Sequence, residues 1–144
     1  MIALDTNVLL RYLLLDDEEQ AKKASVLING SESILITDVV LVEMIWTLKG
    51  KKYKLERGEL IQVINSLFEE KNIYFENAQI IWRALNDYRK AKIVKVNGKN
   101  KIADFSDALI VNKAKFDASN KNKKFNGVYT FDIAARELLG TKEP

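Results

Sequence analysis

Residues Met1–Leu10 read MIALDTNVLL, in which a short apolar run stops at Asp5 and a second apolar stretch begins at Val8. The run Ile2–Leu4 is too short for a helix and predicts a buried strand, whereas Val8–Leu14 predicts a helix. Asp5 lies at the junction, where a carboxylate either caps a helix or begins an active site. The stretch therefore predicts a strand followed by a helix, with an acid at the carboxyl end of the strand.

The same strand-then-helix unit recurs along the chain. Short apolar runs predict further strands at 34–36, 73–75 and 127–129. Helical spacing predicts helices at about 18–28, 37–49, 57–70, 77–91 and 105–118, and a last one that begins at Asp132 and includes Ile133, Ala134, Leu138 and Leu139. Strands separated throughout by helices predict an α/β fold, a three-layer α/β/α sandwich around a mainly parallel sheet of four to five strands. With 144 residues, we expect a single domain over 1–144.

The composition limits the kinds of catalytic and metal sites that the chain can form, because it has no cysteine and no histidine. Their absence excludes a thiol nucleophile, a serine–histidine relay and the usual zinc sites. Carboxylates must therefore carry any catalysis. No signal-peptide pattern and no apolar run of roughly 18 residues is present, so we expect a cytoplasmic protein with no membrane segment.

Five acids lie where a parallel sheet would gather them, because ligands of such sheets bind beyond the carboxyl ends of the strands. Asp5 and Asp132 follow strands, Glu43 lies in the helix after the second strand, and Asp104 and Asp107 begin the helix that leads to the fourth. Crowded carboxylates repel one another unless cations neutralise them. Oxygen ligands favour Mg²⁺ or Mn²⁺, and the corresponding chemistry is metal-assisted hydrolysis of a phosphodiester.

Each of these acids also has a purely structural interpretation. Asp5, Asp104 and Asp132 are well placed as helix N-caps. Glu43 lies inside a helical pattern, where it has no capping role and its alternative is a solvated surface residue. Trp46, Trp82 and Phe68 recur at core spacing, and we interpret them as packing residues, with a partner surface as the alternative for Trp46 or Trp82.

Four segments carry a resemblance to a known family. The pieces LDTNVLLRYLL, VLVEMIWTLKG, IADFSDALIV and VYTFD resemble, in order, the four acidic motifs of PIN domains, and in particular those of VapC-type toxins of toxin–antitoxin pairs. The resemblance implies an Mg²⁺- or Mn²⁺-dependent endoribonuclease that acts on RNA, forms a homodimer and is held inactive by a cognate antitoxin protein. It assigns the catalytic and metal-binding roles to Asp5, Glu43, Asp107 and Asp132, with Asp104 as an additional metal ligand. Thr6, Asn7 and Thr130 match polar positions that orient carboxylates or water.

The segment 93–102, IVKVNGKNKI, departs from that pattern. Relatives pass quickly from the position of Tyr88-Arg89 to the ADF piece, so the segment looks like an insertion. Asn97-Gly98 is a strong hairpin signal, and the segment predicts a small hairpin or a mobile loop. From Lys90 to Lys101 there are five lysines and no acid. We expect Lys95, Lys99 and Lys101 either to be a solvated face or to contact the RNA backbone.

Other functions remain open at this point. One is a PIN-domain nuclease or RNA-binding protein in RNA processing that has no antitoxin. A more remote one is an aspartyl-phosphate phosphotransferase or phosphatase, although haloacid-dehalogenase-like enzymes require a second Asp where this chain has Asn7. A dinucleotide-binding module is excluded because no GxGxxG follows the first strand.

Overall fold

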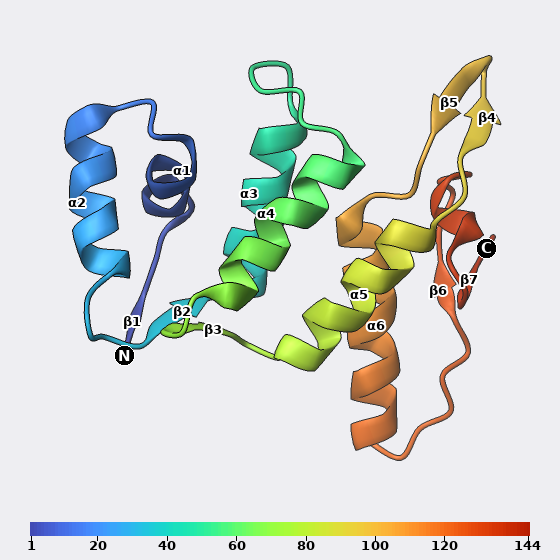
Figure 1. Cartoon of the computed structure of the whole chain (residues 1–144). Helices are drawn as coiled ribbons and strands as arrows, with labels where there is room; N and C mark the ends of the chain where they lie inside the picture. The colour runs from blue at the N-terminus through green and yellow to red at the C-terminus, as the bar shows by residue number, and fades with distance from the viewer. The chain divides into compact units, whose positions relative to one another are not determined.

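The predicted parallel pairing of strands is present in the computed structural model, which describes residues 1–144 (Figure 1). The chain divides into two compact units, Met1–Glu76 and Asn77–Pro144, called here the N-terminal and the C-terminal unit. Five strands outside the 93–102 segment pair in parallel, three in the N-terminal unit and two in the C-terminal unit. The predicted α/β class is therefore confirmed.

The N-terminal unit contains a three-stranded sheet in the order β1-β2-β3. Its elements are β1 (Ile2–Ala3), α1 (Thr6–Leu14), α2 (Glu18–Ile28), β2 (Ile34–Ile36), α3 (Asp38–Lys49), α4 (Arg57–Glu69) and β3 (Ile73–Phe75). Ile34, in the central strand, pairs with Ile2 on one side and Ile73 on the other. Ile34 and Ile36 are fully buried, as a strand covered on both faces requires.

Side-chain caps set where the helices of this unit begin. Asp17 Oδ1 accepts a hydrogen bond of 2.9 Å from the backbone N–H of Gln20 at the start of α2. Thr37 caps α3 in the same way, and Gly50 ends it. These caps satisfy backbone groups that have no partner within the helix.

The C-terminal unit is built on two helices that pack side by side (Figure 1). Its elements are α5 (Ala78–Lys90), β4 (Val94–Val96), β5 (Lys99–Lys101), α6 (Phe105–Asn120), β6 (Val128–Tyr129), the short 3₁₀ turn η1 (Ala135–Glu137) and β7 (Thr141–Lys142). Asn77 caps α5 through Ile80 N–H. Buried Asn112 of α6 donates 2.8 Å hydrogen bonds to Asp87 Oδ2 of α5 and to a backbone oxygen of its own helix, so its amide is satisfied between the helices.

The segment 93–102 forms a hairpin. β4 and β5 pair antiparallel, with Val94 opposite Lys101, Lys95 opposite Asn100 and Val96 opposite Lys99. Asn97 and Gly98 both have positive φ, 52° and 77°, as the tight turn between paired strands requires. The Asn-Gly signal therefore identified this turn correctly.

The helix that was predicted to begin at Asp132 does not form. Only the 3₁₀ turn η1 forms there, and Ile133 and Leu139, which were expected to lie in that helix, are 46% and 89% exposed. The reason is the strand that follows, because β7 pairs in parallel with β6 and was not predicted. Parallel strands need a crossover of about a dozen residues. The segment 130–140 must make that crossover, which leaves room for one short turn.

Two of the three aromatic residues that were expected to pack in the core are exposed instead. Trp46 is 78% exposed and Trp82 is 48% exposed, whereas Phe68 packs on Phe75 with their ring centroids 4.6 Å apart. α3 is apolar around most of its circumference, so spacing alone did not indicate that Trp46 lies on its outer face.

None of the helices combines the length and the apolar composition that a membrane-spanning segment requires.

Candidate functional site

The carboxyl end of β1 presents Asp5 as the N-cap of α1. Asp5 Oδ1 accepts a 2.7 Å hydrogen bond from the backbone N–H of Thr6, which occupies one of the two carboxylate oxygens. The side chain is exposed. Asp5 is thus both the predicted helix cap and an acid directed to solvent at the end of a strand.

Glu43 reaches the same end of the sheet from α3, the helix that follows β2. The hydroxyl of Thr6 donates a 2.5 Å hydrogen bond to Glu43 Oε2, and Thr6 itself is only 7% exposed. The contact follows from the pairing of β1 with β2, because adjacent parallel strands deliver the segments after them to one edge. Within the N-terminal unit, Thr6 therefore links the segment that carries Asp5 to the carboxylate of Glu43.

Asp104 and Asp107 form a reciprocal cap at the start of α6. Asp107 Oδ2 accepts a 2.9 Å hydrogen bond from the backbone N–H of Asp104, and the side chain of Asp104 accepts from the backbone N–H of Asp107. Such a capping box satisfies two backbone donors at once. It also holds the two carboxylates beside each other at the positive end of the helix dipole.

Asp132 follows β6 and is held by its neighbours. Its Oδ1 accepts a 3.0 Å hydrogen bond from Ala135 N–H, and its backbone N–H donates to Thr130 Oγ1 at 3.0 Å. Thr130 and Asp107 line one cavity of about 180 Å³, together with Ile110, Val128, Tyr129, Ala135 and Thr141. Within the C-terminal unit, the end of β6 therefore lies beside the start of α6.

The five predicted acids are divided between the two units. The N-terminal unit holds Asp5 and Glu43, and the C-terminal unit holds Asp104, Asp107 and Asp132. Neither unit by itself brings three or more acidic side chains close enough together to hold a metal ion. The metal-binding role of these acids stays a prediction.

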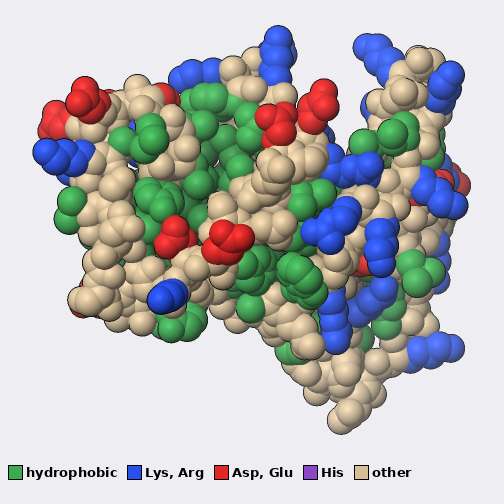
Figure 2. Space-filling model, in the orientation of Figure 1, with side chains coloured by type: hydrophobic (Ala, Val, Ile, Leu, Met, Phe, Trp, Pro, Cys, Tyr) green, Lys and Arg blue, Asp and Glu red, His purple; other side chains and the backbone are tan.

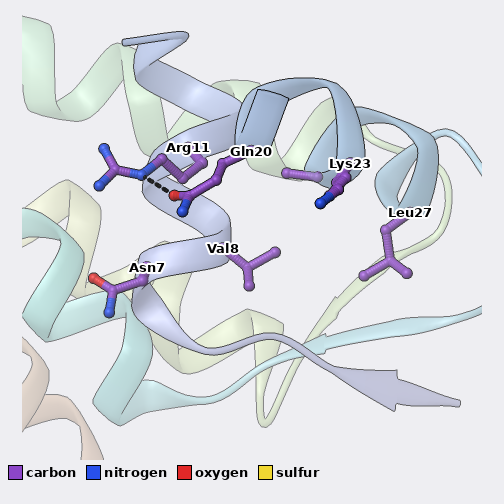
Figure 3. Close-up of a pocket in the computed structure, with 7 residues that line it drawn as sticks. Asn7, Val8, Arg11, Gln20, Lys23 and Leu27 are labelled. Atoms are coloured by element: carbon purple, nitrogen blue, oxygen red, sulfur yellow. Dashed lines mark hydrogen bonds between the residues drawn. The ribbon is translucent and has the colours of Figure 1, made fainter. Parts of the chain in front are cut away.

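A pocket in the N-terminal unit contains residues that were not singled out from the sequence. It has a volume of about 430 Å³ and lies between α1 and α2, where Asn7, Val8, Arg11, Gln20, Lys23, Ala24 and Leu27 line it (Figure 3). Arg11 Nε donates a 2.7 Å hydrogen bond to Gln20 Oε1, and Arg11 Nη1 donates to both oxygens of Asp16 at 2.7 and 2.9 Å. Asn7, expected to orient a carboxylate or water, is placed by the structure on the wall of this pocket.

The ion pair at this pocket could be read only in part from the sequence. The Arg11 guanidinium donates to Asp16 and holds the pKa of that carboxyl below its usual range. The sequence signal for this ion pair was Arg11 in the last turn of a helix, followed by an acid five residues later. Asp17, in the acidic run at 16–19, instead caps α2.

Comparison with protein families decides the classification. The PIN domain family model matches residues 2–137. The chain belongs to the PIN-domain family. This membership confirms the predicted PIN-like α/β fold, and the family consists typically of nucleases that use divalent metal ions.

Two further comparisons complete the description of this PIN domain. One crystal structure with similarity over 99% of this chain and 98% of its own is that of VapBC2 from Rickettsia felis bound to a DNA fragment from their promoter. The two chains share 16% sequence identity, with a TM-score of 0.35. No curated protein matches the chain. The classification therefore rests on the family model.

Proposed function

We propose that this PIN domain is a divalent-metal-dependent endoribonuclease that hydrolyses phosphodiester bonds of RNA. The observation that carries the proposal is the contact between Thr6 and Glu43, which ties two of the four family acids, Asp5 and Glu43, to one end of a parallel sheet. Asp107 and Asp132 supply the other two acids, from the start of α6 and the end of β6. Asp5, Glu43, Asp107 and Asp132 are the proposed catalytic residues.

The chemistry of these side chains fits Mg²⁺ or Mn²⁺. All proposed ligands are carboxylate oxygens, with Asp104 as a fifth, and the chain has neither histidine nor cysteine to favour a softer metal. When bound, such an ion supplies an acidified water and neutralises charge on the phosphate. The role of the protein is to hold the carboxylates in place, which the Thr6 hydroxyl does for Glu43 and the capping box does for Asp107.

We further propose that the protein is the toxin of a toxin–antitoxin pair, acts in the cytoplasm as a homodimer and is inhibited by a cognate antitoxin. This part is supported by the resemblance of the four acidic segments to VapC-type toxins. A PIN nuclease or an RNA-binding protein of RNA processing is the alternative. A growth assay of cells that express the protein distinguishes the toxin from the RNA-processing alternative, because expression of a toxin arrests growth. For a toxin, Asp5→Asn should relieve the arrest. Co-expression of a small protein encoded immediately upstream should relieve it as well.

The nuclease proposal is tested by titrating Mn²⁺ into purified protein and measuring RNA cleavage. We expect Asp5→Asn and Asp107→Asn each to lower the cleavage rate by at least about 100-fold. Asp17→Asn is the matched control, since it also removes one acid from a helix N-terminus and Asn is an equally good cap. If the Asp5 and Asp107 variants cleave RNA like the wild type, the proposed site is wrong.

A further inference from the structure

The two units carry opposite net charges. The C-terminal unit has 14 Lys and Arg against 7 Asp and Glu, a formal charge of +7, whereas the N-terminal unit has 9 against 13, a charge of −4. In the space-filling view, the Lys and Arg side chains of the C-terminal unit gather over α5, α6 and the β4–β5 hairpin (Figure 2). The overall charge of +3 conceals this concentration, which points to a polyanionic ligand for the C-terminal unit.

The register of the hairpin separates its lysines by face. Residues directly opposite each other in an antiparallel pair point to the same side. Lys99 and Lys101 therefore share a face with their partners Val96 and Val94, whereas Lys95 lies on the other face opposite Asn100. All three lysines are exposed, while both valines are half-buried. The face that holds Lys99 and Lys101 thus presents two ammonium groups beside two valines. The opposite face presents only the ammonium group of Lys95.

These lysines have no structural role of the kind that explains other cations in the unit. Arg89 and Lys90 end α5, where positive charge is favourable, and Lys121 pairs with Asp117 at 2.8 Å. Lys95, Lys99 and Lys101 make no ion pair and lie in no helix. Edge strands do use lysine to prevent aggregation, but that role does not require two lysines on one face of the same strand. The second lysine of β5, on the same face as the first, is left unexplained.

We propose that the face of the hairpin formed by Lys99, Lys101, Val94 and Val96, called here the Lys99/Lys101 face, binds the sugar-phosphate backbone of the RNA substrate. The inference rests on the proposed ribonuclease function and adds a substrate contact outside the carboxylate site. Lysine acts on phosphate as a point charge, so these contacts give affinity without sequence preference. An acidic protein segment is less suited to this face, because the valines are half-buried and little apolar surface is offered beside the charges.

The test measures binding of a fluorescein-labelled single-stranded RNA by anisotropy, in EDTA so that the RNA is not cleaved. Each phosphate neutralised contributes about 0.7 to the slope of log affinity against log salt. We expect Lys99→Ala/Lys101→Ala to reduce that slope by about 1.4 and to weaken binding about 25-fold at 0.1 M salt, with almost no effect near 1 M. Lys95→Ala should change the slope by less than about 0.3, because it lies on the opposite face.

Matched controls separate position from net charge and from folding. Lys22→Ala/Lys71→Ala removes two exposed lysines from the N-terminal unit and should leave the slope unchanged. Lys99→Arg/Lys101→Arg keeps both charges and should bind like the wild type. Circular dichroism checks that each variant is folded, and Lys99→Gln/Lys101→Gln, which also removes both charges, provides the same test where the alanine variant is unstable.

Three results would overturn the proposal. One is an unchanged slope for the Lys99/Lys101 variant, and another is an equal loss for Lys95→Ala. The third is a variant that binds RNA normally but loses affinity for poly-glutamate, which would assign the face to an acidic protein. Failure of the ribonuclease proposal looks different, because the wild type would then bind RNA in this assay yet show no metal-dependent cleavage.

Discussion

The hydroxyl of Thr6 donates a 2.5 Å hydrogen bond to Glu43 Oε2 across 37 residues of sequence. Thr6 is buried at the start of α1, so its hydroxyl has few other partners, whereas the Glu43 side chain is exposed. A bond from a buried donor to an exposed carboxylate restricts the orientation of the carboxylate. Thr6 is therefore a positioning residue for Glu43.

Thr6→Val removes this hydroxyl at nearly constant volume. We expect the free energy of unfolding to fall by about 1 kcal/mol, the usual net value of one hydrogen bond. Metal-dependent RNA cleavage should fall by about 10- to 100-fold, as when a carboxylate ligand loses its supporting partner. Chemical denaturation and cleavage kinetics measure the two effects separately.

Thr6→Ser is the control for this prediction, because it retains the hydroxyl and loses only a methyl group. Its cleavage rate should stay close to that of the wild type. A valine variant that cleaves as fast as the serine variant would show that Glu43 needs no positioning by Thr6.

The Asp104–Asp107 capping box gives a second prediction, in which helix capping and metal binding are separated. Asp104→Ala should lower the free energy of unfolding by about 1 kcal/mol, because the N-cap of α6 is lost. Asp104→Asn should leave stability nearly unchanged, since Asn caps as well as Asp, but it removes a carboxylate. If Asp104 is a metal ligand, both variants need more Mn²⁺ for half-maximal cleavage.

The comparison of the two Asp104 variants decides the role of this residue. Equal Mn²⁺ requirements for Asp104→Asn and the wild type, together with a destabilised Asp104→Ala, would leave capping as the only function. Isothermal titration with Mn²⁺ in the absence of RNA gives the same answer without relying on activity.

Several features of this PIN domain were predictable because they depend on local sequence. The hairpin follows from Asn97-Gly98, which tolerates the positive φ of a tight turn. The start of α2 follows from Asp17, whose side chain caps the helix. Strands at 34–36 and 73–75 were predicted to the residue, because each is a short apolar run between turn signals.

Other features depend on pairing between distant segments, which local patterns do not encode. The turn at Ala135–Glu137 looked like a helix because its apolar residues have helical spacing, yet the pairing of β7 with β6 shortens it. Thr6 was identified only as a polar position of the family, whereas its bond to Glu43 depends on the register of β1 and β2. Local chemistry thus predicted which residues are candidates, and tertiary pairing determines their partners.

Metal binding should also stabilise the fold, which gives a third prediction. An ion that binds only the native state raises the free energy of unfolding by about 2.7 kcal/mol at 100 times its dissociation constant. We expect Mn²⁺ to raise the thermal midpoint of the wild type, and EDTA to reverse the rise. Asp5→Asn should lose most of this response while Asp17→Asn keeps it. An identical rise for all three proteins would indicate binding elsewhere.

The last prediction concerns pH and the ion pair between Arg11 and Asp16, in which one guanidinium nitrogen contacts both carboxylate oxygens. The hydrogen bond from Arg11 lowers the pKa of Asp16 in the folded protein from its ordinary 3.8. A lowered folded-state pKa stabilises the protein fully above the unfolded pKa, and this contribution disappears as the pH falls through the folded value. Asp16→Asn should therefore be less stable than the wild type at pH 6, with the difference shrinking below pH 3.8. Urea denaturation across pH 2–7 measures this, and Arg11→Gln should show the same trend because it removes the other partner. A difference between wild type and Asp16→Asn that does not change with pH would mean that the charge on Asp16 contributes nothing and that only its packing matters.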